Sequence, residues 1–272
     1  MEFVDWDKLD IPKFVYKYRD WKAPFHKTII TERKVFFSPP KEFPDLIDCK
    51  NNIRYDLLTG EEIRWSYYND SKTKTPHLGE EYHRKFADEW YAKSPLLDEE
   101  FIKRHLEKDF LAYNERLGIL SLTTNPSNIK MWELYGSNHT GFCVGFTSKS
   151  MFPHLRGAGS AINYCDELPI IKPYPWEDRI TQTYKQIYFK LEEYDFEEEY
   201  RTHNFSYYPL TIEQRTIALP QEAYYEIIFG AAMKQESRAE IIKISQHTIP
   251  NIKFREVLIS GPSISIRDFI DV

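Results

Sequence analysis

An alternating run of charged side chains at positions 196–205 is the segment of this sequence best suited to chemistry. Glu197 and Glu199 lie two residues apart, and Arg201 and His203 continue the alternation. On a β-strand, residues two apart lie about 6.6–7 Å apart on the same face, so all four side chains would share one surface. One carboxylate could then orient a ligand while the other stabilises or deprotonates a reacting group. We therefore predict that Glu197 and Glu199 are the catalytic pair.

The same segment also has a purely structural interpretation. Six of the eight residues at positions 192–199 are acidic. Acidic runs most often form a solvated surface. The residues alone therefore leave both the catalytic and the surface interpretation open.

Three further residues are suited to binding a polar or anionic ligand. Arg19 ends an aromatic-rich segment and could hold a phosphate or carboxylate through paired hydrogen bonds, or form an ordinary surface ion pair. Ser38 precedes Pro39-Pro40 and could donate to a ribose hydroxyl or cap the turn. His139 lies in a predicted loop just before a predicted strand. We predict that these three side chains contribute to a binding site.

The aromatic content of the chain is 16%. Aromatic faces of this abundance line clefts for planar ligands as well as cores. Trp132 and Tyr135 lie three residues apart, at helical spacing, which is more often a core pattern than a ligand platform. Both interpretations are carried forward.

Periodicity predicts the elements that must position these side chains. Two-residue alternation predicts strands, and apolar residues three or four apart predict helices. The predicted strands are 14–19, 34–38, 118–123, 142–146, 161–165, 196–205 and 252–259, and the predicted helices are 80–93, 101–113, 131–135, 180–191 and 234–246. Turn-forming residues predict a loop over about 50–78. We expect one α+β domain over 1–272, with a mainly antiparallel sheet and a helical insertion at about 79–117.

Composition narrows the function classes. The net charge of −6 gives no overall electrostatic attraction to a nucleic-acid backbone. Three cysteines without a CxxC pair, and eight histidines without paired metal spacing, favour neither a disulfide framework nor an obligatory metal. No uncharged apolar run approaches the ~20 residues of a membrane span. We expect a cytoplasmic protein that does not enter the membrane.

Seven segments in the same order make the chain resemble the bacterial domain-of-unknown-function family 2971. They are Tyr16–Arg19, Val35–Phe43, Gly118–Leu122, Met131–Tyr135, His139–Phe146, Glu197–Arg201 and Glu226–Gly230. The sequence departs from the family pattern at Phe43–Asp48, where the family usually reads Phe-Asn-Asp-Pro-Phe-Asp, and at Tyr194, where it usually has Trp. The first departure weakens any catalytic role for Asp45.

A second, looser likeness concerns function. An arginine on the first strand, a strand-end serine and a late Glu-x-Glu strand are similar to the arrangement of ADP-ribosyltransferases, whose split sheet holds NAD in a cleft. The likeness implies that Arg19 holds the pyrophosphate or nicotinamide ribose and that Ser38 fixes the ribose. It further implies that Glu199 stabilises the oxocarbenium ion and that Glu197 orients or deprotonates the acceptor.

The likeness also implies a set of contacts around NAD. Tyr18 and Trp132 would stack on its rings, and Tyr135, His139 and Arg201 would complete the binding set. We therefore expect an NAD-consuming ADP-ribosyltransferase or NAD glycohydrolase with an ADP-ribosyltransferase-like core. NAD would be its substrate, and its acceptor would be an unidentified protein or nucleic acid. A toxin or phage-defence effector is the biological role in which such enzymes are commonly used.

Two other function classes remain open. A non-catalytic nucleotide or nucleic-acid binding module could use aromatic side chains with a local basic face such as Lys72–Lys74 with Arg84 and Lys85. A metal-dependent hydrolase or nuclease could use Asp45 and Asp48 with the two glutamates. Salt dependence of binding would identify the first class, and loss of activity in chelator the second.

Overall fold

A computed structural model describes residues 9–45, 47–155, 159–261 and 263–270 of the chain. The chain forms two compact units. The first comprises Met1–Phe43, Glu115–Asp166 and Lys190–Val272, and the second comprises Pro44–Asn114 and Glu167–Phe189.

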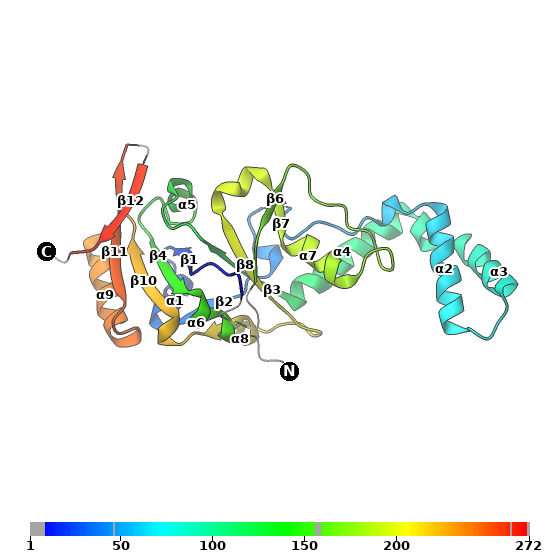
Figure 1. Cartoon of the computed structure of the whole chain (residues 1–272), viewed down its shortest axis with the longest axis horizontal. Coiled ribbons are helices and arrows are strands. Elements are labelled where there is room, and N and C mark those ends of the chain that lie inside the picture. The colour runs from blue at the N-terminus through cyan, green and yellow to red at the C-terminus, as the bar shows by residue number, and fades with distance from the viewer. Residues whose placement is uncertain (1–8, 46, 156–158, 262, 271–272) are drawn as a thin grey trace. The chain divides into compact units, whose positions relative to one another are not determined.

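An eight-stranded sheet organises the first unit (Figure 1). Its strands lie in the order β12 (Ser263–Asp268), β11 (Lys253–Ser260), β10 (Tyr224–Phe229), β4 (Phe142–Thr147), β1 (Phe14–Arg19), β3 (Leu117–Thr123), β8 (Glu199–Phe205) and β5 (Ser160–Ala161). The β10–β11 pair is parallel, and the other neighbours are antiparallel. The prediction of an α+β fold with a mainly antiparallel sheet is therefore confirmed.

The sheet is interrupted between β1 and β3. All six residues of β1 pair with β4, but β1 and β3 pair only at Tyr16 and Thr123. Further along β3, an isolated bridge pairs Ser38 with Ile119 instead. Because β1 and β3 pair at a single position, the backbone N–H and C=O groups that face each other beyond this position are available to other partners.

Alternation along the central strands separates two hydrophobic clusters. Val15, Leu120 and Val144 belong to the larger cluster. Tyr16 and Cys143 belong to the smaller one. Successive side chains of a strand point to opposite faces, so each face of the sheet has its own core.

Short helices and two small sheets complete the first unit. The helices are α1 (Pro24–Thr31), α5 (Ile129–Leu134), α6 (Ser148–Met151), α8 (Ile212–Arg215) and α9 (Gln235–Thr248), the last of which connects the parallel strands β10 and β11. Strand β2 (Lys34–Phe36) pairs with β9 (Thr216–Ala218), and β6 (Asn163–Cys165) pairs with β7 (Phe189–Leu191).

The second unit is helical. It contains α2 (Gly60–Lys74), α3 (Glu80–Tyr91), most of α4 (Glu99–Arg116) and α7 (Arg179–Ile187). The helices expected at 80–93 and 101–113 are present. No helix among the described residues has the length and apolar character that crossing a membrane requires.

The expected loop at 50–78 is wrong, because α2 occupies most of it. Thr59 and Glu62 form a reciprocal capping box at its start, a signal that the turn residues obscured. Only Ile63 and Ser71 are buried along the helix, so apolar periodicity could not reveal it. A buried hydrogen bond from Ser71 to the His83 imidazole ties α2 to α3 instead, with donor and acceptor set by the histidine tautomer.

Candidate functional site

The acidic segment does not form one continuous strand. Glu197 ends a 3₁₀ helix over Glu192–Glu197, and β8 begins only at Glu199. Between them Glu198 adopts the left-handed conformation, with φ of 42°. The expectation that Glu197 and Glu199 share a strand face is therefore wrong, because the turn at Glu198 breaks the alternation. Glu199 and Arg201 do lie on one strand, two residues apart.

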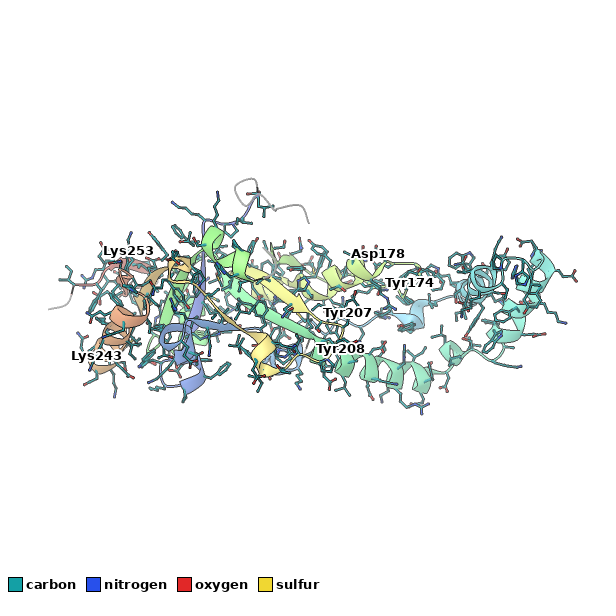
Figure 2. All side chains as sticks on the ribbon, turned by 90° about the horizontal axis from the view of Figure 1, so that it is seen from below. Tyr174, Asp178, Tyr207, Tyr208, Lys243 and Lys253 are labelled. Carbon is teal, nitrogen blue, oxygen red and sulfur yellow. The ribbon has the colours of Figure 1, made fainter. Side chains whose placement is uncertain are left out.

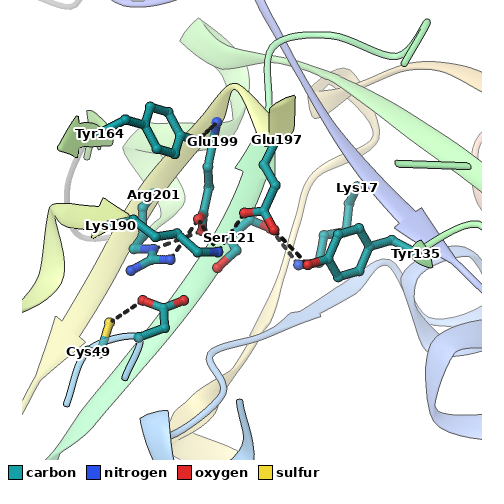
Figure 3. Close-up of polar contacts among 10 residues, drawn as sticks. Lys17, Cys49, Ser121, Tyr135, Tyr164, Lys190, Glu197, Glu199 and Arg201 are labelled. Atoms are coloured by element: carbon teal, nitrogen blue, oxygen red, sulfur yellow. Dashed lines mark hydrogen bonds and ion pairs between the residues drawn. The ribbon is translucent and has the colours of Figure 1, made fainter. Parts of the chain in front are cut away.

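Glu197 and Glu199 nevertheless meet in one buried cluster through Lys190. The Lys190 Nζ atom lies 2.6 Å from Glu197 Oε2 and 3.6 Å from Glu199 Oε2. Both glutamates and the lysine are almost completely buried. Figure 3 shows the ammonium between the two carboxylates, so the site is built by a residue of β7 that links the turn to β8.

Arg201 holds Glu199 from the same strand. Its Nε donates to Glu199 Oε1 at 2.8 Å, and its Nη2 donates to Glu199 Oε2 at 2.7 Å. The backbone N–H of Glu199 donates to the Tyr164 hydroxyl at 2.9 Å. Paired hydrogen bonds between a guanidinium and a carboxylate fix both groups in orientation (Figure 3).

Glu197 has a different environment. The Tyr135 hydroxyl donates to Glu197 Oε1 at 2.7 Å. Tyr135 follows α5 and is 40% exposed, so its ring extends from the buried carboxylate to solvent. Among the predicted site residues, Tyr135, Glu197, Glu199 and Arg201 are therefore brought together.

The two glutamates have opposite shifts in pKa. Burial would raise the pKa of Glu199, but the charges of Arg201 and Lys190, with hydrogen bonds from Arg201 and Ser121, lower it to about 2. Burial raises the pKa of Glu197, and the nearby Glu199 carboxylate adds to this effect, against the charge of Lys190. Neighbouring carboxyl groups with separated pKa values are typical of a pair in which one stays ionised and the other exchanges protons.

Two cations of β1 lie where the strand leaves β3. Lys17 Nζ donates to the carbonyl oxygen of Ser121 at 2.5 Å, and Arg19 Nη1 donates weakly to the carbonyl oxygen of Tyr18 at 3.4 Å. Both side chains are partly exposed. Within the described part of the chain, no carboxylate lies at ion-pair distance from either cation.

The pKa values of this cation pair reflect desolvation. Burial, helped by the charge of Arg19, lowers the pKa of Lys17 to about 7. Burial also lowers the pKa of Arg19 to about 10. The pKa of His26 on α1 is lowered by burial and then by the charges of Arg19 and Lys17. The His26 Nδ1 accepts from the Asp20 N–H, which leaves the proton on Nε2.

Two expected stacking residues are core residues. Trp132 is 0% exposed and donates through Nε1 to the Pro126 carbonyl oxygen. Tyr18 is 4% exposed, and its ring meets Trp132 edge-on at 4.9 Å. Because neither ring has a free face, the expectation that they stack on a ligand is wrong. For Trp132, the helical spacing was therefore a core pattern, which is the alternative carried forward from the sequence.

Ser38 and His139 lie apart from the glutamate cluster in their contacts. Ser38 uses its backbone N–H and carbonyl in the bridge to Ile119, at 2.9 and 2.8 Å. His139 has a φ of 63°, and its ring stacks on Trp132 with a centroid distance of 6.2 Å. Its Nδ1 atom is buried without a hydrogen-bond partner in the described residues. Among the described residues, neither Ser38 nor His139 contacts Glu197 or Glu199 through a hydrogen bond or ion pair, so their assigned roles stay predictions.

Sequence reasoning missed the lysines of the site. Lys17 is the charged residue in the middle of the buried strand β1, and Lys190 is the charged residue between Phe189 and Leu191 in β7. Lysine is rarely buried without a partner or a function. A lysine within a strand of apolar or aromatic residues was therefore the sequence signal that could have identified Lys17 and Lys190 as site residues.

The chain was compared with protein-family models, curated proteins and solved structures. No protein-family model, curated protein or solved structure matches it. Among the described residues, no group of three or more His, Cys, Asp or Glu side chains is arranged to hold a metal ion.

Proposed function

We propose that the first unit binds NAD through its pyrophosphate and cleaves the bond between nicotinamide and ribose, transferring ADP-ribose to water or to a macromolecular acceptor. The observation that carries the proposal is the pair of cations Lys17 and Arg19. They lie partly exposed at the interruption of the sheet, without a carboxylate at ion-pair distance in the described chain. Such cations favour an anionic ligand, and arginine matches phosphate oxygens bidentately.

The neighbouring glutamates supply the chemistry of the proposal. The pKa of Lys17 responds to the charges of Glu199 and Glu197, so an anion held at Lys17 would lie near both carboxylates. Glycosidic cleavage releases nicotinamide with the bonding electron pair and leaves positive charge on the ribose. Glu199, whose pKa is held at about 2, would remain ionised to stabilise that charge.

Glu197 takes the second role. Its raised pKa suits a group that accepts a proton from the attacking water or acceptor as the new bond to ribose forms. Tyr135, which is hydrogen-bonded to Glu197 and exposed on its other side, gives a path for that proton toward solvent. As part of the same proposal, we infer that the chain belongs to the bacterial family that it resembles, that it acts in the cytoplasm, and that it serves as a toxin or a phage-defence effector.

A second candidate function is nucleotide binding without catalysis. It is favoured by the contacts of Glu199, because Arg201 and Lys190 offset much of the negative charge that would stabilise an oxocarbenium ion. In that case the cations of β1 would bind phosphate, and the glutamates would only maintain the fold.

The test is nicotinamide release from NAD together with calorimetric binding of NAD and ADP-ribose. We compare the wild type, Arg19→Gln, Glu197→Gln and the matched control Lys243→Gln, an exposed cation on α9 (Figure 2). The proposal expects release by the wild type and the control, loss of binding in Arg19→Gln, and retained binding with at least ~100-fold slower release in Glu197→Gln.

The other outcomes distinguish non-catalytic nucleotide binding from the absence of either function. Binding that depends on Arg19 without release, alone or with cell lysate, would support the non-catalytic alternative. Absence of binding by the wild type would refute both functions. Circular dichroism of each variant establishes that it is folded before it is compared.

A further inference from the structure

Helix α3 has a row of aromatic side chains that the rest of the described chain covers only in part. Tyr82, Phe86 and Trp90 are four residues apart, so they line one side of the helix. The centroid of the Phe86 ring lies 6.4 Å from that of Tyr82 and 5.7 Å from that of Trp90. Tyr67 of α2 extends the row, because its ring centroid lies 6.1 Å from that of Trp90. These four residues are called the aromatic row below.

The aromatic row differs from a core in its exposure. His83 and Ala87, on the adjacent side of α3, are buried where this helix lies beside α2 (Figure 1). In contrast, Tyr82 is 47% exposed and Trp90 is 49% exposed. Exposed aromatic side chains that contact one another are typical of interaction surfaces, since aromatic residues are enriched at protein interfaces. The aromatic row is therefore suited to being covered by another molecule.

The charges of this helical pair favour a protein partner over a nucleic acid. Positions 60–93 contain seven acidic and six basic residues, so they have no excess of positive charge. Lys72 is paired with Glu80, and Lys74 is paired with Asp70, each at 2.8 Å. A nucleic-acid backbone would have to compete with these carboxylates for the two lysines.

Two charged side chains flank the aromatic row on its outer edge. Lys85 and Glu89 are four residues apart on α3, and the helical period places them on the side of the row away from His83 and Ala87. Both are exposed, and neither forms an ion pair within the part of the chain that the structure describes. One cation and one anion along the same edge are complementary to the same edge running in the opposite direction.

We propose that the aromatic row is a homodimer interface, in which α3 packs antiparallel against α3 of a second copy of this chain. A two-fold axis beside Phe86 brings this ring against the partner's Phe86. It also brings Tyr82 against the partner's Trp90, because each lies four residues, or about 6 Å along the helix, from the axis. The proposal concerns the helical unit and does not depend on the NAD chemistry of the first unit.

The flanking charges determine the direction of packing. In the antiparallel arrangement Lys85 lies beside the partner's Glu89, and Glu89 lies beside the partner's Lys85. A parallel arrangement would instead place lysine beside lysine and glutamate beside glutamate, which is unfavourable. Two copies of the same helix therefore match both in their aromatic side chains and in their charges when they run antiparallel.

The experiment is sedimentation velocity of the full chain at concentrations from about 1 µM to about 500 µM. We expect a reversible dimer with a dissociation constant on the order of 10 µM, because one helix face in each copy forms a small interface. Phe86→Glu should weaken self-association at least ~100-fold, because it places two carboxylates at the centre of the interface. Ile180→Glu is the matched control, since Ile180 is an 83% exposed apolar residue of α7 in the same unit.

Charge reversal tests the direction of packing. Lys85→Glu and Glu89→Lys should each weaken self-association ~10-fold, because each variant has like charges along its whole edge. An equimolar mixture of the two variants should form a dimer with about the affinity of the wild type, since an acidic edge then meets a basic one. Arg84→Glu is the matched control for Lys85→Glu, because Arg84 is exposed on the opposite side of α3.

Circular dichroism establishes that each variant is folded before association is compared. If Phe86→Glu does not fold, the two charge reversals at exposed positions test the interface without it. A wild type that stays monomeric up to about 500 µM would refute the proposal, as would a dimer that Phe86→Glu and both charge reversals leave unchanged.

Two further results would overturn the arrangement or the partner. A dimer that is lost in Phe86→Glu but is insensitive to both charge reversals would refute antiparallel packing. A monomer whose tryptophan fluorescence changes on addition of single-stranded DNA at low salt, with no change in Phe86→Glu, would assign the aromatic row to a nucleic acid and refute the homodimer.

Discussion

Replacing Glu199 by glutamine removes a negative charge from the most buried part of the site while keeping the side chain's size. Glu199 is 5% exposed, and Arg201, which holds it with two hydrogen bonds, is 0% exposed. Loss of one partner from such a buried pair typically costs about 3–5 kcal/mol, because the remaining charge stays desolvated. We therefore expect Glu199→Gln to destabilise the protein strongly at neutral pH.

The pKa of Glu199 gives an independent magnitude. Its fall from 4.5 to about 2 corresponds to about 3 kcal/mol of folding free energy. A carboxyl group with a lowered pKa in the folded state stabilises the protein fully above its unfolded pKa, and this contribution disappears as the pH falls through the folded value. The difference between wild type and Glu199→Gln should therefore be about 3 kcal/mol at pH 7 and shrink as the pH falls from about 4.5 toward 2.

Urea unfolding followed by fluorescence, at several values between pH 3 and pH 8, measures this difference. Glu193→Gln is the matched control, because Glu193 is an exposed glutamate of the same acidic segment. The control should change the unfolding free energy by less than about 0.5 kcal/mol. A loss in Glu199→Gln that is the same at pH 3 and pH 7, or no larger than that of the control, would refute the reasoning.

Two further substitutions test the packing and the charge of the first unit. Lys17→Met should stabilise the protein by ~2 kcal/mol below pH 7, a value reduced to allow for the partial exposure of the lysine. This gain should vanish as the pH rises from about 7 toward 10.5, because the protonated amine is penalised only in the folded state. A gain in unfolding free energy that grew with pH, measured by urea unfolding, would contradict this reasoning. Gly230→Ala should destabilise by ~2 kcal/mol, because its Cβ would lie 2.2 Å from the His139 carbonyl oxygen. Gly79→Ala, whose Cβ would meet nothing within 4 Å, serves as its control in thermal unfolding, and similar losses in both variants would contradict the steric argument.

Elements with strong apolar periodicity were predictable from the sequence. Strand β1 spans Phe14–Arg19 as predicted, because its alternation of side chains directly reflects two differently buried faces. Helix α2 was missed because its polar residues carry no such period and it is held by capping and by hydrogen bonds to α3. The break at Glu198 was missed because a left-handed conformation at a single residue does not alter the alternation of residue types from which the strand was predicted.

The composition of the candidate site was only partly predictable. Glu199 and Arg201 could be paired from their spacing, because neighbours two apart on a strand share a face. Lys190 precedes Glu197 by seven residues and Lys17 lies on a different strand, so no spacing rule connects them to the glutamates. Conversely, the aromatic side chain of Trp132 is of a type that can stack on a planar ligand, and only its burial against Tyr18 excludes that role.

The sequence by itself determined strands with clear alternation such as β1, the two-residue pairing of Glu199 with Arg201 and the presence of a lysine within an aromatic strand. These properties are local, since they depend on backbone period and on side-chain type. Tertiary structure alone decided that β1 leaves β3 beside Lys17 and that Lys190 lies between two carboxylates. It also decided that the pKa of Glu199 falls while that of Glu197 rises, because desolvation and charge interactions depend on which distant residues the fold brings into contact.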